Sequence, residues 1–209
     1  MTVYGAPHEV LTIGHSNHTI ERFIELLCQH RVTAVADLRS SPYSQMHAHF
    51  NREALAAALK RDGIAYSFLG KELGGRPADK NCYENGRVQY RRVAATPIFR
   101  SGLDRLLAGV ARYRMALMCA EREPLDCHRT LLVTPELEKA GVTVLHIHAD
   151  GRTESHSDAM SRLLNLFGLA DEDLFRSRPE LIEEACYRRQ ERVAFSEKPT
   201  LQDARQAAR

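Results

Sequence analysis

The most reactive side chains of this chain are concentrated in one short segment, residues 115–129. Cys119 directly follows the apolar run 115–118, which has the length and flanks of a buried strand. A thiolate can act as a nucleophile, imidazole and carboxylate groups can move protons, and guanidinium groups bind anions. The segment supplies all of these groups, as Glu121, Arg122, Cys127, His128 and Arg129. The predicted site uses Cys119 as nucleophile, the glutamate and the histidine as catalytic groups, and the two arginines as anion ligands.

Cys119 is expected at the carboxyl end of its strand, where the loops of open α/β sheets bind ligands. Pro124 and the apolar residues from Leu131 onward indicate a loop that turns into a helix. The backbone N–H groups of such a helix start, together with nearby arginines, would favour thiolate over thiol. The alternative is that Cys119 is a small buried residue and that its polar neighbours form a structural ion-pair network.

A first predicted strand, at 9–13, is also followed by polar residues. His15, Ser16 and Asn17 come next, before an amphipathic helix capped by Asn17 or Thr19. We expect His15 to be catalytic and the next two residues to bind an anion, because they too follow a strand. The alternative is that His15 is an ordinary loop or capping histidine.

A second predicted strand, at 33–38, contains Asp37 and is followed by Arg39. The two residues alternate with apolar ones, so both are expected to point toward the edge that carries Cys119. Asp37 is interpreted as a catalytic carboxylate and Arg39 as an anion ligand. A purely structural Asp37–Arg39 pair is the alternative, since buried ion pairs often serve geometry alone.

A glycine-containing, basic segment covers residues 70–92 and is predicted to be a long loop. Gly74 and Gly75 would let the backbone approach a ligand closely, and Arg76 suits a phosphate or carboxylate. Long loops inside a domain are usually functional or disordered, so a solvated mobile loop is the alternative. Two tyrosines are its only aromatic residues, which makes the nucleic-acid signal weak.

Composition sets limits on the class of protein. The 29 Lys and Arg residues nearly balance the 27 Asp and Glu residues among 209, so charge gives no global argument for nucleic acid or membrane. Five cysteines form no regular framework, and no leader-like or membrane-spanning apolar run is present. We therefore expect a cytoplasmic protein without a membrane partner.

The alternation of apolar strands and amphipathic helices predicts an α/β fold, a three-layer αβα arrangement with a mostly parallel sheet of about five strands and extra C-terminal helices. Residues 8–150 are expected to form the core domain, 151–195 a helical extension packed on it, and 196–209 a polar, disordered tail. The strands are predicted at 9–13, 33–38, 64–69, 115–118 and 142–147.

Several short motifs, taken in order, resemble the bacterial and archaeal family known as domain of unknown function 488. The resemblance covers about residues 10–150 and implies a three-layer α/β fold, but no established activity. The break expected at Pro135 departs from the uninterrupted helix of the family. The motifs that carry the resemblance are Thr12-Ile13-Gly14-His15-Ser16-Asn17-His18, Asp37-Leu38-Arg39-Ser40-Ser41-Pro42, Phe50-Asn51, Glu72-Leu73-Gly74-Gly75, Cys119-Ala120-Glu121 and Cys127-His128-Arg129.

A weaker, architectural likeness is to rhodanese-type and cysteine-phosphatase-type domains. Those domains place an acidic-x-Arg sequence at one strand end and a cysteine loop at another, as Asp37 and Cys119 do here. Where the phosphatase pattern has its arginine this chain has Leu125, and where active rhodaneses have theirs it has Pro124. The likeness favours cysteine chemistry without defining a reaction.

Three functions remain open at this point. The first is an enzyme that uses Cys119 for sulfur, acyl or phosphoryl transfer on an anionic small molecule or nucleotide; this interpretation assigns no metal and leaves the cofactor unknown. The second is a metal-binding hydrolase or domain that uses cysteine and histidine ligands. The third is a non-catalytic module that binds a nucleotide or nucleic acid. The sequence leaves the oligomeric state open.

Overall fold

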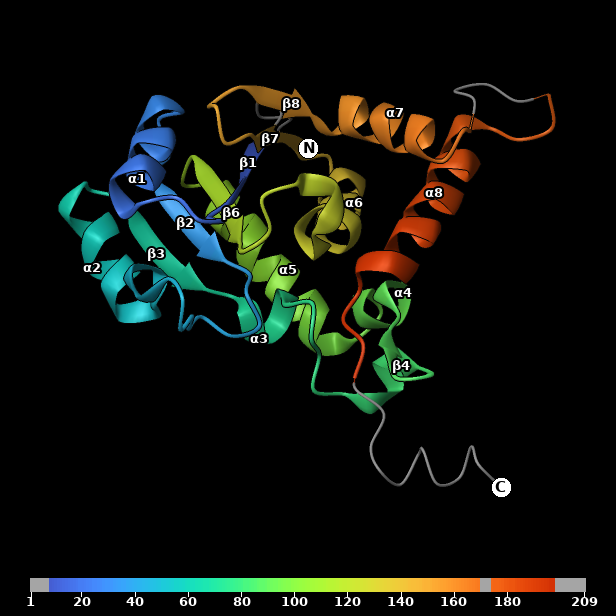
Figure 1. Ribbon diagram of the computed structural model, residues 1–209, viewed down its shortest axis with the longest axis horizontal. Coiled ribbons are helices and arrows are strands. Elements are labelled where there is room, and N and C mark those ends of the chain that lie inside the picture. Colours follow the sequence, from blue (N-terminus) through green and yellow to red (C-terminus); the bar gives the residue numbers. More distant parts are fainter. Residues whose placement is uncertain (1–7, 170–173, 198–209) are drawn as a thin grey trace, which may run out of the picture.

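A six-stranded sheet organises the computed structural model, which describes residues 8–169 and 174–197 (Figure 1). Its strand order is β3-β2-β6-β1-β7-β8, and every neighbouring pair is parallel except β7 and β8. The mostly parallel sheet confirms the predicted fold class. The strands are β1 (Glu9–Gly14), β2 (Ala34–Asp37), β3 (Ala65–Phe68), β6 (Met115–Cys119), β7 (Thr143–Ile147) and β8 (Thr153–Ser155).

Helices cover both faces of the sheet, which gives the three predicted layers (Figure 1). One face packs against α1 and α2, and the other against α4 to α8. Burial of each apolar helix face against the sheet is the main source of stability for such layers. The helices are α1 (Ile20–Gln29), α2 (Arg52–Arg61), α3 (Gly70–Leu73), α4 (Tyr90–Ala94), α5 (Pro97–Val110), α6 (Thr134–Lys139), α7 (His156–Leu166) and α8 (Arg178–Val193).

Successive side chains of each central strand alternate between the two faces, as the pleat requires. Ile13 and Met118 belong to the core beneath α1 and α2. Leu117 and Ala36 belong to the core beneath α5 and α6. At the carboxyl edge, the position of a side chain in this alternation therefore determines whether it lies on the α1–α2 face or on the α5–α6 face.

Local sequence signals place several helix ends correctly. The Thr19 hydroxyl accepts the N–H of Arg22 at 3.2 Å and so caps α1, while Thr96 caps α5 with Pro97 at its first turn. The break expected at Pro135 takes the form of a π-helical turn, η4 (Arg129–Val133), directly before α6. Proline cannot donate the hydrogen bond that a regular helix needs there.

The segment 70–92 is not the long loop predicted from its glycines and arginines. It folds into α3, a 3₁₀ turn, the hairpin β4 (Tyr83–Glu84) and β5 (Arg87–Val88), and then α4. The reason is that apolar side chains interspersed among the polar ones, including Leu73, Cys82, Val88 and Val93, are buried in the core. Composition alone hides such a pattern.

The C-terminal part adds more than helices, because residues 153–155 form the sixth strand. A run of three polar residues shows no alternation, so this strand was outside the prediction. Ser196 pairs with Arg87 and the Glu197 N–H bonds to the Gly86 carbonyl, whereas the rest of the predicted tail lies outside the described residues. No helix in the described part of the chain has both the length and the apolar character needed to cross a membrane.

Candidate functional site

Four potential metal-binding side chains meet at the carboxyl end of β6, and we refer to them as the thiol cluster. One donor atom from each of Cys119, Glu121, Cys127 and His128 lies within 4.8 Å of the others. Both cysteines and the histidine are buried, whereas Glu121 remains exposed. Residues separated along the chain are brought together because the loop after β6 folds back over its end through the 3₁₀ turn η3 (Pro124–Asp126).

The imidazole of His128 has a defined orientation. Its Nε2 lies 3.0 Å from the carbonyl oxygen of Leu38, at the end of β2. Because a carbonyl can only accept, Nε2 carries the proton and the lone pair of a neutral ring is on Nδ1. Nδ1 faces the sulfur atoms of Cys119, at 3.6 Å, and Cys127, at 3.8 Å. Nδ1, which carries the lone pair when the ring is neutral, thus points between the two sulfur atoms.

The two thiols have different acidities. Burial raises the pKa of Cys119, and the neighbouring Cys127 sulfur raises it further. Burial also opposes ionisation of Cys127, but the Cys119 hydrogen bond and the charges of Arg129 and His128 outweigh it and hold its pKa well below the ordinary value. Cys127, and not the expected Cys119, is therefore the thiol that the surroundings favour as thiolate. Although Glu121 as a whole is exposed, desolvation of its carboxylate, and then the charge of Cys127, raise its pKa; this carboxylate lies 3.0 Å from Cys127 Sγ.

The guanidinium of Arg129 is buried and bonds to backbone carbonyls. Its Nη1 donates to the Glu121 carbonyl at 2.7 Å, and its Nη2 lies 3.5 Å from the Arg122 carbonyl. Its N–H groups therefore stabilise the loop after β6. The sequence instead predicted Arg129 to be an anion ligand. The side chain of Arg122 is exposed at the surface of the same loop.

The glycine pair and the basic residues of 70–92 have packing roles. A Cβ on Gly75 would lie 3.0 Å from Cγ of His128, so this glycine allows close packing against the cluster, whereas a Cβ on Gly74 would lie 2.3 Å from the backbone oxygen of Gly70. Arg76 stacks on the ring of Phe195 at 4.6 Å. Arg91 and Arg92 form ion pairs with glutamates. The expected anion ligands of this segment are thus engaged with the protein itself.

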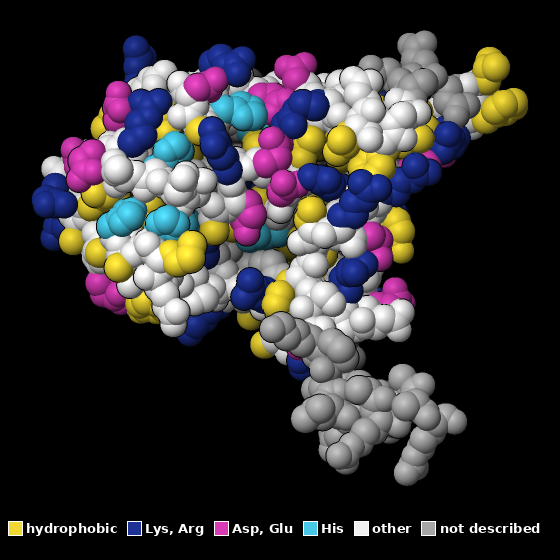
Figure 2. Space-filling model, viewed as in Figure 1, with side chains coloured by type: hydrophobic (Ala, Val, Ile, Leu, Met, Phe, Trp, Pro, Cys, Tyr) yellow, Lys and Arg dark blue, Asp and Glu magenta, His cyan; other side chains and the backbone are white. Residues whose placement is uncertain are grey.

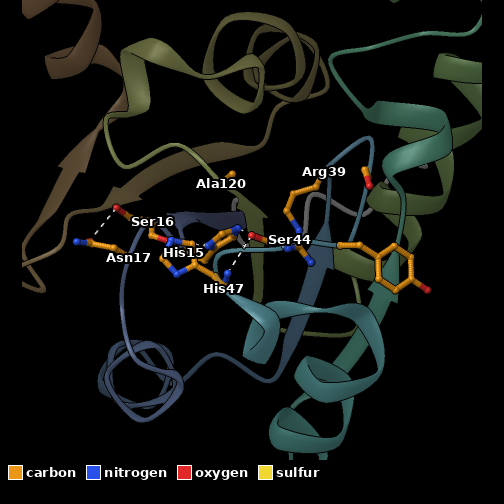
Figure 3. Close-up of a pocket in the computed structure, with 9 residues that line it drawn as sticks. His15, Ser16, Asn17, Arg39, Ser44, His47 and Ala120 are labelled. Carbon is orange, nitrogen blue, oxygen red and sulfur yellow. Dashed lines mark hydrogen bonds between the residues drawn. The ribbon is translucent and has the colours of Figure 1, made fainter.

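A separate cavity of about 390 Å³ lies at the ends of β1 and β2, and we call it the strand-end pocket (Figure 3). His15, Ser16, Asn17 and Arg39, all predicted site residues, line it. The loop that follows β2 supplies the rest of the wall, which the sequence analysis did not identify. These additional residues are Ser41, Tyr43, Ser44 and His47, together with Ala120.

Arg39 is held from behind by Asp37. Its Nε and Nη2 donate to the two carboxylate oxygens at 2.9 and 2.7 Å, and Nη2 also donates to the Phe50 carbonyl at 2.9 Å. The hydroxyl of Tyr66 donates to the same carboxylate at 2.8 Å. Both charges are almost fully buried, so the two side chains form a buried ion pair in which Asp37 holds one edge of the guanidinium.

His15 is a neutral side chain at neutral pH. Burial, and then the charge of Arg39, lower its pKa to about 4. Its Nδ1 donates to the Ser16 carbonyl at 2.9 Å, so the lone pair is on Nε2, which lies 3.5 Å from Nη1 of Arg39. The ring also stacks on Phe50 at 4.4 Å. Arg39 Nη1 therefore donates to His15 Nε2, and the two side chains lie side by side at the pocket (Figure 3).

The predicted residues form two sites instead of one. His15 continues the alternation of Ile13, and Arg39 that of Val35, so both lie on the α1–α2 side of the sheet. Cys119 continues the alternation of Leu117 and lies on the α5–α6 side. The expectation of a single cleft around the Cys119 sulfur is therefore corrected, although the two sites meet where Ala120 follows the cysteine.

This fold and these sites define an α/β protein with a cysteine–histidine cluster and a polar pocket at the carboxyl edge of a parallel sheet. Residues 19–134, more than half of the chain, match the family described as "Domain of unknown function DUF488". The chain belongs to this family, as the motifs predicted. Searches of curated proteins and of solved structures found no match.

Proposed function

We propose that the protein binds a zinc-type metal ion in the thiol cluster. The observation that carries this proposal is the orientation of His128, whose Nδ1 lone pair faces two sulfur atoms while Nε2–H is held by the Leu38 carbonyl. Metal-binding histidines typically donate their second ring N–H to a carbonyl or carboxylate in this way. The hydrogen bond to the Leu38 carbonyl would also connect the end of β2 to the metal site.

The distances also suit a tetrahedral ion. With Zn–S near 2.3 Å and Zn–N near 2.0–2.1 Å, a regular tetrahedron separates sulfur and nitrogen by about 3.5 Å. The two sulfur–nitrogen distances here are 3.6 and 3.8 Å. Thiolate and imidazole donors select zinc over hard cations such as magnesium. These two distances therefore support the fit of His128 and the two cysteines to such an ion.

Four protein donors make a closed site, which is typical of structural zinc. Cys119 would hold the end of β6, and Glu121, Cys127 and His128 would hold the loop that follows it. In this role the metal stabilises the carboxyl edge of the sheet, and the strand-end pocket beside it is left to bind other molecules. The proposal thus favours the metal-binding alternative over thiol catalysis.

The test is elemental analysis of protein purified without chelators. We expect about one zinc per chain, and loss of most of it in Cys127→Ser and His128→Ala variants, because each removes a ligand. Cys186→Ser is the matched control, since this thiol lies on α8 and contacts Met160 instead of the cluster. Wild-type protein that takes up no zinc, even when zinc is supplied, would contradict the proposal.

Thiol chemistry is the second candidate, and the surroundings of Cys127 favour it. The backbone N–H of Arg129 lies 3.5 Å from Cys127 Sγ, and His128 lies beside it. A thiolate so placed could attack a sulfur, acyl or phosphoryl centre of an anionic substrate, with Cys119 as its partner thiol. Both sulfurs are buried, so the segments packed around them would have to move to admit a substrate.

Iodoacetamide labelling of chelator-treated protein at pH 6.5 distinguishes the two candidates. Under the second, Cys127 is modified faster than the exposed Cys28, which serves as an internal reference. Under the first, Cys127 reacts more slowly than Cys28, and added zinc slows it further. Slow labelling of Cys127 with and without zinc rules out thiol catalysis.

A further inference from the structure

The strand-end pocket lies on the α1–α2 side of the sheet and shares no side chain with the thiol cluster. Figure 2 shows several histidine side chains at the surface on the left half of the molecule, where α1 and α2 lie in Figure 1. A cavity of about 390 Å³ falls in the size range of small-molecule sites. Its ligand can therefore be considered independently of the metal.

One terminal nitrogen of the Arg39 guanidinium, Nη1, faces this pocket. Nε and Nη2 are engaged by Asp37 and Phe50, which leaves Nη1 as the donor group directed to His15 and the cavity. The guanidinium is only 5 % exposed, so it cannot adopt other positions. An arginine held in this way is preorganised to bind an oxyanion, because little conformational entropy is lost on binding.

His15 lies beside that donor and helps to hold it. The single lone pair of its neutral ring, on Nε2, accepts one N–H of Arg39 Nη1 at 3.5 Å, which leaves the second N–H of Nη1 for a ligand. The charged or titratable groups that face His15 are Arg39, Asp37 and His47. A ligand that fits this donor has an anionic oxygen. Phosphate oxygens accept hydrogen bonds more strongly than sulfate oxygens, because phosphate is the more basic anion.

The remaining wall is rich in donors. The Ser44 hydroxyl accepts the N–H of His47 at 3.1 Å, which leaves its own proton available, and Ser41 contributes a second hydroxyl (Figure 3). Asn17 adds an amide. Among the described residues that line the pocket, none is acidic, because Asp37 lies behind Arg39. Donors without a competing carboxylate favour a phosphate group.

We propose that the strand-end pocket binds a small organic phosphate monoester. The phosphate lies against the second N–H of Arg39 Nη1, with the serine hydroxyls on its other oxygens. The cavity is several times larger than a phosphate group, so it has room for an organic part of about the size of a pentose. This inference goes beyond the proposed metal function and does not depend on it.

Isothermal titration calorimetry with ribose 5-phosphate, inorganic phosphate and sulfate tests the proposal. We expect ribose 5-phosphate to bind more tightly than inorganic phosphate, and sulfate most weakly. Ser41→Glu places a carboxylate at the exposed rim and should weaken ribose 5-phosphate binding at least about tenfold, through charge repulsion. Ser157→Glu, at an exposed position of α7, is the matched control for the added charge.

Arg39→Lys keeps the positive charge but loses the planar guanidinium with its several N–H donors. We expect it to weaken ribose 5-phosphate binding as well. If this variant fails to fold, Ser41→Glu still decides the question, because its site is exposed. No detectable heat with ribose 5-phosphate up to about 10 mM, or equal binding by Ser41→Glu and wild type, would overturn the proposal. Zinc content measured on the same samples shows separately whether the metal proposal holds.

Discussion

Buried histidines are the most distinctive residues of this protein outside the two sites. His146 on β7 bonds to the Thr12 hydroxyl at 2.8 Å through Nδ1, and its Nε2 lies 3.2 Å from Nδ1 of His156. Burial lowers the pKa of His146 to about 2 and that of His156 to about 4. Together with His15, these rings are neutral in the folded protein at pH 7.

Their neutrality predicts sensitivity to acid. A histidine whose pKa is lower in the folded than in the unfolded state takes up its proton more readily when unfolded, so stability falls as pH drops below about 6.5. Each unit of lowering corresponds to about 1.4 kcal/mol for each group. We expect the free energy of unfolding to fall by several kcal/mol between pH 7 and pH 4, measured by urea denaturation.

The variant His156→Gln separates this effect from acid release of a metal, because it removes one of the three rings outside the thiol cluster. Its stability should depend less on pH than that of the wild type. The pKa of His128 is raised, through Cys127, Glu121 and the Leu38 carbonyl, so this residue opposes the trend without cancelling it. A free energy of unfolding that stays constant from pH 7 to pH 4 would contradict the prediction.

At the residue scale, the sequence identified the reactive side chains better than the atoms that each of them contacts. Cys119, Cys127 and His128 do come together, and Asp37 does pair with Arg39. The acidity of Cys127 could not be inferred, because it depends on which atoms the fold places around each sulfur. Arg129 was expected to face a ligand and instead bonds to carbonyls across the loop, a contact that no local pattern reveals.

At the scale of elements, the end of β1 and the loop after β6 make a very close contact at the carboxyl edge of the sheet. A Cβ built on Gly14 would lie 1.9 Å from the carbonyl oxygen of Glu121. The backbone N–H of His15 bonds to the Cys119 carbonyl at 2.8 Å, and that of Ser16 to the Ala120 carbonyl at 3.0 Å. The two segments therefore run together beyond the last residues of their strands.

Gly14→Ala should consequently disturb both sites at once. We expect a loss of roughly 2–4 kcal/mol in the free energy of unfolding, because backbone cannot move aside as a side chain can. Gly109→Ala is the control, since its Cβ would meet only the flexible end of Met115 and alanine favours the helix α5. Thermal denaturation of both variants checks this, and equal melting temperatures would refute it.

Elements with clear periodicity were predictable, and the others were not. The strands at the centre of the sheet and the helices α1, α5 and α7 follow from runs of apolar residues and their caps. The short strand β8 depends on pairing with β7, and the turns between α3 and α4 depend on burial of a few apolar side chains in the core. No local preference in their sequences distinguishes them from loops.

At the scale of the whole molecule, sheet order explains why one expected site became two. Side-chain alternation can be read from each strand, but the side of the sheet that each set faces depends on which strands are neighbours. β6 lies between β1 and β2, in register with both. The cysteine and the histidine that follow adjacent strands therefore point to opposite faces, although the sequence analysis placed them correctly at the same edge.

The central position of β6 also has a consequence for synthesis of the protein. β1 and β2 come first from the ribosome, yet neither can pair with the other, because Val10 and Ala34 both take Met115 as their partner. Closing these long loops costs chain entropy before any hydrogen bonds between the strands can form to offset that cost. In a nascent chain, the middle of the sheet can therefore assemble only after β6 has emerged.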